Sequence, residues 1–296
     1  MPNLKEVRLR IESVKSTQQI TSAMKMVSAS KLRRAQQAIV TLRPYAVKMT
    51  GILQNLRQGL GEQAENPYIA SRKADKVLIV VLASNRGLCG AFNTNIIKAV
   101  KALIENDFAG HFTRGSLGLL CAGKHATDFF VRRNYPVIAR RDELFDKMSF
   151  EKIAPLAKEL MQYYVSGEYD QIVLVYNQFK NAAVQRLVTE PFLPFPEPVL
   201  DAQSSRKQQV DYIFEPGKQA ILDEIIPKAL TLQIYKAFLD SYASEQGARM
   251  TAMHQATDNA GELIKQLRLS YNKARQSAIT NEIIEIVGGA EALKSR

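Results

Sequence analysis

The residues best placed for chemistry lie in the glycine-containing stretch SNRGLCGAFN, residues 84–93. It follows an apolar run of strand type and precedes a helical stretch, a position where many proteins bind phosphate through backbone N–H groups. Only the pair Gly87-x-x-Gly90 is present, without the third glycine of a dinucleotide fingerprint or the Lys-Ser/Thr of a P-loop. The stretch is therefore weak support for a nucleotide site, and a structural tight turn is the favoured interpretation.

Metal binding and nucleophilic catalysis find no support in the spacing of the reactive side chains. His111, His125 and His254 stand far apart, with no convergent ligand set and no nucleophile–base signature. The acidic stretch 142–146 is better explained as a solvated loop than as a pair of catalytic carboxylates. We therefore expect no catalytic residue, no metal and no cofactor.

The two cysteines, Cys89 and Cys121, lack the spacing of a metal site. Cys89 lies near Arg86 and a helix N-terminus, where a thiol can be activated, although a buried structural cysteine is the favoured interpretation. Two free thiols fit a reducing compartment, and no apolar run has the length of a membrane span or the form of a signal peptide. These features predict an intracellular protein.

The central part of the chain, residues 75–200, alternates short apolar runs with helical stretches. Continuous apolar runs such as KVLIVVLAS are typical of strands that are buried on both faces. Strands are expected at residues 76–84, 116–123, 136–141 and 171–179, and helices at 93–105, 124–133 and 150–166. This alternation predicts a Rossmann-like α/β domain with a mainly parallel sheet, to which residues 184–194 add an antiparallel hairpin strand.

Residues 1–57 carry an apolar heptad repeat that is typical of a coiled coil. Its apolar seam positions are Leu4, Val7, Ile11, Val14, Leu32, Ala35, Ile39, Leu42, Ala46, Met49, Leu53 and Leu56. Between Val14 and Leu32 the same seam positions are occupied by polar residues, which we call the polar window: Gln18, Thr21, Lys25 and Ser28.

In the polar window the apolar residues Ile20, Met24 and Val27 sit one position before the seam. The apolar stripe therefore turns by roughly 100° around the helix. We expect the polar window to pack less fully against a partner helix than the seam from Leu32 to Leu56. The turned stripe is expected to face another molecule.

A second long helix is expected from residue 216 to 292, with polar seam residues at Lys236, Gln246 and Thr257. Pro227 predicts a kink or a two-part helix, and Gly288-Gly289 predicts the helix end. Each apolar seam is best buried against the other long helix, which predicts an antiparallel two-stranded coiled coil.

The second helix is the longer of the two, so its C-terminal end should extend past the N-terminus by about 25 to 35 Å. Apolar side chains on this end would face water unless another chain covers them. They are Ile279, Ile283, Ile284, Ile286 and Val287.

Positive charge is concentrated on the first helix. The formal net charge of the chain is +11, and residues 1–57 hold eleven Lys or Arg and two Glu, a net charge of +9. A solvated helix face, an acidic protein partner and a nucleic-acid backbone each fit such a charge. Aromatic residues do not alternate with these charges, so the base-stacking platforms of single-strand binders are absent.

Four segments of the chain carry a family resemblance. They are TQQITSAMKMVSASKLRRAQ (17–36), SNRGLCGAFN (84–93), ASEQGARMTAMHQATDNA (243–260) and YNKARQSAITNEIIEIVGGAEAL (271–293). Together they resemble the gamma subunits of F-type ATP synthases, the last segment fits the C-terminal signature of that family, and the resemblance covers the whole sequence.

The resemblance implies a central rotor shaft inside a ring of alpha and beta subunits, with the globular end resting beside the epsilon subunit on the membrane ring of c subunits. Proton flow would turn the shaft and drive the catalytic sites of the ring through open and closed states during ATP synthesis. The chain would itself be non-catalytic and would bind no nucleic acid. It would be peripheral at the cytoplasmic face of the bacterial plasma membrane.

The resemblance also implies a set of residues that contact the alpha/beta ring: Met24, Lys25, Arg249, Arg275, Gln276, Thr280, Glu282 and Glu285. Met24 and Lys25 match the family's contact with an acidic loop of beta, and the other six match C-terminal positions that couple the shaft to the ring. A basic helix that faces an acidic loop gains long-range attraction, and exposed charge pairs break easily during rotation.

Two other classes of function stay open. A coiled-coil scaffold or a DNA-binding hinge also places a globular domain on an antiparallel coiled coil, although such hinges have far longer arms and an ATPase head. A nucleotide-binding enzyme built on the α/β domain predicts tight nucleotide binding by the isolated chain.

Overall fold

The structure is a computed structural model that describes residues 4–60, 66–69, 72–145, 148–182, 184–195 and 217–294. The chain divides into two compact units. We call residues 1–28 together with 249–296 the helical unit, and residues 29–248 the sheet unit.

A five-stranded sheet forms the centre of the sheet unit. Its strands are β1 (Val77–Leu82), β2 (Leu117–Ala122), β3 (Val137–Arg140), β4 (Gln171–Phe179) and β5 (Gln185–Leu193). Their order is β3-β2-β1-β4-β5, and every neighbouring pair is parallel except β4 and β5, which form an antiparallel hairpin. This confirms the predicted mainly parallel sheet and its hairpin strand.

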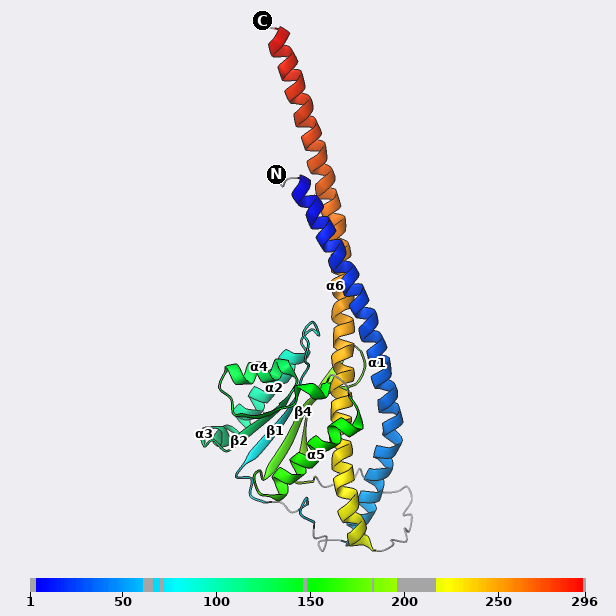
Figure 1. The fold of residues 1–296 in the computed structure, drawn as a ribbon, viewed down its shortest axis with the longest axis vertical. Coiled ribbons are helices and arrows are strands. Elements are labelled where there is room, and N and C mark those ends of the chain that lie inside the picture. The colour runs from blue at the N-terminus through cyan, green and yellow to red at the C-terminus, as the bar shows by residue number, and fades with distance from the viewer. Residues whose placement is uncertain are drawn as a thin grey trace. The chain divides into compact units, whose positions relative to one another are not determined.

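Each face of the sheet packs against helices, because side chains alternate between the two faces of a strand. Leu78, Val80 and Leu82 of β1 belong to a core with α5 (Phe150–Val165), α6 and the end of α1. The alternate residues of β1 belong to a second core with α2 (Phe92–Asn106) and α4 (Lys124–Arg132). Figure 1 shows α2 and α5 on opposite sides of the sheet.

Two short helical segments were not expected from the sequence. They are α3 (Ala109–Thr113) and the 3₁₀ segment η2 (Asp142–Phe145). Both are shorter than two turns of α-helix, so neither contains a repeat of apolar residues that could be recognised.

The two long helices are α1 (Leu4–Leu60) and α6 (Lys218–Lys294). Of the two expectations for Pro227, a kink or a two-part helix, the two-part helix is wrong, because α6 is one helix that includes this proline. Leu222, Ile226 and Leu230, on either side of the proline, are fully buried, so the helix is packed in the core before and after Pro227. The expected end at Gly288-Gly289 is also wrong, since a glycine within a helix costs only about 1 kcal/mol relative to alanine.

The paired parts of α1 and α6 in the helical unit are antiparallel. Gln18 contacts Thr257, and Lys25, further along α1, contacts His254, which lies earlier in α6. This confirms the predicted direction of the coiled coil.

Candidate functional site

The loop that follows β1 is a tight turn whose polar groups bond to one another. Leu88 and Gly90 adopt positive φ angles of 60° and 59°. The backbone N–H of buried Ser84 donates to Asn93 Oδ1 at 3.1 Å, and Asn93 Nδ2 donates to Ser84 Oγ at 2.8 Å. Ser84 Oγ in turn lies 2.8 Å from the carbonyl oxygen of Arg86. The side chains nearest to a phosphate-cradle position therefore hold the loop in shape.

The carboxyl end of the sheet, where open α/β proteins commonly bind ligands, is covered by α6. Ser241 Oγ donates to the carbonyl of Leu82 at the end of β1 (3.4 Å), and Ser244 Oγ donates to the carbonyl of Asn177 in β4 (3.0 Å). Both serines are fully buried. The small side chains of α6 thus bring its backbone against the strand ends and fill the crevice.

The thiols and the acidic stretch have structural surroundings. Cys89 and Cys121 are buried, and burial raises the pKa of the Cys121 thiol to about 12, with the nearby Asp142 carboxylate acting in the same direction. The expectation of a solvated acidic loop is wrong for Asp142, because its carboxylate accepts bonds from Gly123 N–H (3.1 Å) and Thr127 Oγ1 (2.9 Å) and so fixes the start of α4. Asp146 lies outside the described residues.

The three histidines lie in separate places. His111 Nε2 is 2.9 Å from the carbonyl of Ala74, and His125 lies beside Gly87. His254 is on α6 in the helical unit. Within the described ranges, no group of three or more His, Cys, Asp or Glu is arranged to hold a metal ion.

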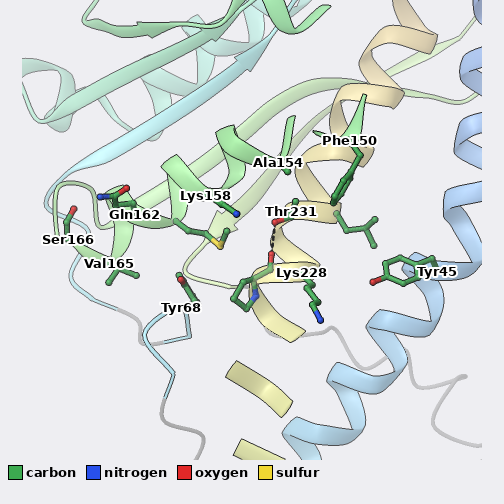
Figure 2. A pocket seen from close by; sticks show the side chains of 13 residues that line it. Tyr45, Tyr68, Phe150, Ala154, Lys158, Gln162, Val165, Ser166, Lys228 and Thr231 are labelled. Carbon is green, nitrogen blue, oxygen red and sulfur yellow. Dashed lines mark hydrogen bonds between the residues drawn. The ribbon is translucent and has the colours of Figure 1, made fainter. Parts of the chain in front are cut away.

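A cavity of about 920 Å³ opens between α5, α6 and α1 in the sheet unit. Figure 2 shows apolar side chains such as Phe150 and Val165 at its wall, with Tyr45 reaching it from α1. The dashed bond in the figure, from Thr231 Oγ1 to the carbonyl of Pro227 at 2.7 Å, lies within α6. The charged groups at this wall are Lys158 and Lys228, and the lining contains no acid to pair with them as an acid–base couple.

The polar window of α1 is not loosely packed throughout. Ser28 is only 2% exposed and Thr21 only 9%, whereas the apolar seam residues Ile39 and Leu42 are half-buried. The expectation of weaker packing is therefore wrong for Thr21 and Ser28, because small side chains fit closely beside a neighbouring helix. Gln18 and Lys25 are half-buried, and the side chain of Leu56 lies outside the described residues.

The turned apolar stripe is present on the surface of the helical unit. Ile20 and Val27 are 57% and 54% exposed, as expected for positions off the seam, while Met24 between them is half-buried. Neighbouring Met26 is also exposed. An apolar strip with a half-buried lysine beside it, Lys25, is thus available on α1.

The residues implied to contact a ring of subunits occupy separate parts of the helical unit. Met24 and Lys25 are half-buried on α1, and Arg249 is buried on α6. Five are exposed further along α6: Arg275, Gln276, Thr280, Glu282 and Glu285. Arg249 and Arg275 are 26 residues apart on one helix, a rise of about 39 Å, so the structure does not gather the set into one patch.

Lys25 has close neighbours that sequence reasoning missed. Its Nζ lies 3.3 Å from His254 Nδ1. His254 Nδ1 in turn lies 3.3 Å from Asp258 Oδ2. The spacing of His254 and Asp258 by four residues on an exposed helix face was the available signal. The sequence does not show whether His254 or Asp258 lies opposite Lys25, because that depends on the register of the two helices.

The C-terminal stretch of α6 is bare. Every residue from 279 to 290 is exposed, including five large apolar side chains. Ile286 is 71% exposed. This matches the expectation of an end that no other part of the described chain covers.

Comparison with known proteins gives a consistent family. A family model described as ATP synthase matches residues 3–293. The chain is 53% identical to the ATP synthase gamma chain of Christiangramia forsetii over 99% of both chains, and 50% identical to that of Cytophaga hutchinsonii over 100% of both.

Solved structures with a similar fold also come from ATP synthases. A chain from the central stalk and c-ring of the Tetrahymena thermophila mitochondrial ATP synthase is 26% identical, with a TM-score of 0.58, and the match covers 80% of this chain and 99% of that one. A chain from the OSCP/F1/c-ring structure of the Euglena gracilis mitochondrial ATP synthase matches 98% of this chain and 94% of its own, with a TM-score of 0.64. At 22% identity, the second likeness concerns the fold alone. No helix among the described residues is long and apolar enough to cross a bilayer.

Proposed function

The chain belongs to the family of ATP synthase gamma chains, and from this premise we propose that it is the rotating shaft of the central stalk. In this role it couples proton-driven rotation of a membrane ring of c subunits to conformational changes at the catalytic sites of an alpha/beta ring. The observation that carries the proposal is the bare apolar end of α6.

That bare end supports contact with a ring of subunits. Exposed residues Ile279, Ile283, Ile284, Ile286 and Val287 lie within a nine-residue stretch of one helix. Apolar side chains at this density mark an interaction surface in a soluble protein. A collar formed by alpha and beta subunits would remove them from water without fixing a rotational angle.

The basic face of α1 supports an acidic partner. The net charge of +9 on residues 1–57 favours acidic protein surfaces over long distances, and exposed ion pairs contribute only about 0 to 1 kcal/mol each. Contacts of this strength form and break as a shaft turns. We propose that Met24 and Lys25 contact beta in this way, and that Arg249, Arg275, Gln276, Thr280, Glu282 and Glu285 couple α6 to the ring.

We further propose that the chain contributes no catalytic residue. The crevice at the carboxyl end of the sheet is filled by Ser241 and Ser244 of α6, which supports a structural use of the α/β domain. In this proposal residues 1–57 and 216–292 form the shaft, and residues 75–200 form the globular end. That end would rest with the epsilon subunit on the c-ring, peripheral at the cytoplasmic face of a bacterial plasma membrane.

Purification from its own cells at moderate ionic strength tests this function. A tagged full-length chain should bring down the alpha, beta and epsilon subunits with ATPase activity, and no nucleic acid. Recovery of the chain alone, or with DNA and without alpha and beta, would contradict the shaft role and favour the DNA-binding hinge. Tight ATP binding by the isolated chain would favour the enzyme alternative.

A further inference from the structure

One hydrogen-bonded polar layer crosses between the two helices of the helical unit. Thr21 Oγ1 of α1 lies 2.8 Å from Thr257 Oγ1 of α6. Gln18 Nε2 on the same side of α1 donates to the backbone carbonyl of Thr257 at 3.5 Å. Gln18, Thr21 and Thr257 thus form a polar layer between the helices. The seam residues of α6 on either side of Thr257, Met253 and Ala260, are apolar and buried.

A glycine completes the layer. A Cβ added at Gly261 would stand 3.1 Å from Gln18 Nε2, which is closer than about nine in ten Cβ contacts in proteins. Any other residue at position 261 would require the Gln18 amide to shift by a few tenths of an ångström, which would disturb its 3.5 Å bond to Thr257. Shape and hydrogen bonding both select the same pairing of the helices.

An apolar heptad seam does not by itself distinguish registers that differ by seven residues. If α6 slipped by one heptad, Thr21 would face Met250 or Ile264 instead of Thr257. Each threonine hydroxyl could then bond only to a carbonyl of its own helix, since Thr21 Oγ1 lies 3.0 Å from Gln18 O and Thr257 Oγ1 lies 2.7 Å from Met253 O. The bond between the helices would be lost.

We propose that Thr21, Thr257, Gln18 and Gly261 form a register key that fixes the axial position of α1 against α6 in the helical unit. The key positions Lys25 level with His254, at the observed 3.3 Å, and so determines which part of α6 stands beside the turned apolar stripe. Its use rests on the proposed function, because torque on a two-stranded shaft tends to slide one helix along the other. A polar layer resists this sliding where a uniform apolar seam does not.

A distance measurement in the purified full-length chain tests the key. Nitroxide labels at Ser13→Cys and Asn281→Cys, both exposed, report the axial position of α1 against α6. The natural cysteines Cys89 and Cys121 are buried and poorly accessible to label. The unaltered key should give one narrow distance, and the pair Thr21→Val with Thr257→Val should broaden it or add a second distance, because the contact that sets the register in the helical unit is lost.

Matched variants isolate the cause. Thr21→Ser with Thr257→Ser keeps both hydroxyls and should keep the single distance, as should Ile11→Val with Ile264→Val, which trims the apolar seam only. Gly261→Ala should also displace or broaden the distance, and it serves if the valine pair does not fold. An unchanged single distance in both the valine pair and Gly261→Ala overturns the key. The measurement involves no partner subunit, so that result would leave the shaft role standing, whereas a failed co-purification would not alter the register result.

Discussion

At the scale of single residues, the polar side chains near the loop after β1 form hydrogen bonds within the chain. Ser84, Asn93 and Asp142 hold loops and helix starts at the carboxyl edge of the sheet. The helical unit instead exposes apolar side chains, at Ile20, Val27 and residues 279–287. This separation explains why the sequence motif around Gly87 does not lead to a binding site.

Asp240 of α6 is a buried carboxyl group that opposes folding at neutral pH. Burial raises its pKa from 3.8 to about 6, although Lys236 and Arg43 act in the opposite direction. A carboxyl pKa that is higher in the folded state means that the folded chain binds the proton more tightly. Stability from this group therefore increases as the pH falls from above 6 towards 4.

Asp240→Asn should accordingly raise the free energy of unfolding at pH 8 by about 1 to 3 kcal/mol. The gain should shrink as the pH falls through 6 towards 4, where Asp240 is protonated in the folded chain and partly protonated in the unfolded chain. Urea unfolding of the isolated chain at a series of pH values measures it, with exposed Asp107→Asn as the control. A gain that is the same at pH 4 and pH 8 would show that the carboxyl charge is not the cause.

Lys25 gives a second prediction at this scale. Lys25→Glu should slow association of the chain with the alpha/beta ring by about two- to fivefold at low salt, because it places a negative charge at the proposed acidic contact. Lys15→Glu makes the same change in net charge at an exposed site on the same helix. Stopped-flow association at two salt concentrations compares them, and equal effects would remove Lys25 from the interface.

At the scale of elements, the strands and the long helices could be predicted because their apolar periodicity is strong. The runs around Val80 and Leu174 are buried on both faces, as continuous apolar runs require. The continuation of α6 through Pro227 could not be predicted, since the residues around this proline are packed in the core of the sheet unit and the sequence of the helix does not show that core. The close packing of Thr21 and Ser28 also depends on which residues of α6 stand opposite, and a single helix sequence does not contain that information.

The bare end of α6 gives the prediction at this scale. Ile283→Ser, Ile284→Ser and Ile286→Ser together should lower proton transport per ATP hydrolysed, or the yield of assembled complex, by at least about tenfold, since each buried isoleucine contributes about 1.5 to 3 kcal/mol. Unfolding of the isolated chain should hardly change, because these side chains are exposed there. Reconstituted vesicles and urea unfolding provide the two readouts.

The control for this variant is Asn281→Ser, an exposed polar change on the same stretch. If the triple serine variant assembles and transports protons as the control does, the apolar end is not the contact that carries the proposed function.

At the scale of the whole molecule, the chain combines a sheet unit with a buried core and a helical unit with apolar and basic surface. The first gives a rigid body on which a membrane ring could act, and the second presents contacts that break easily. Both are needed for a shaft that turns inside one set of subunits while it is fixed to another. Membership of the gamma-chain family accounts for this combination.

Rotation itself is the most direct measurement. The complex is held to a surface by its alpha/beta ring, and a bead is attached to the sheet unit through Asn106→Cys, an exposed position at the end of α2. The account predicts that the bead turns continuously in one direction while ATP is hydrolysed and stops when ATP is removed. Steady ATP hydrolysis with a bead that only fluctuates about one angle would contradict the proposal that this chain is the rotating shaft.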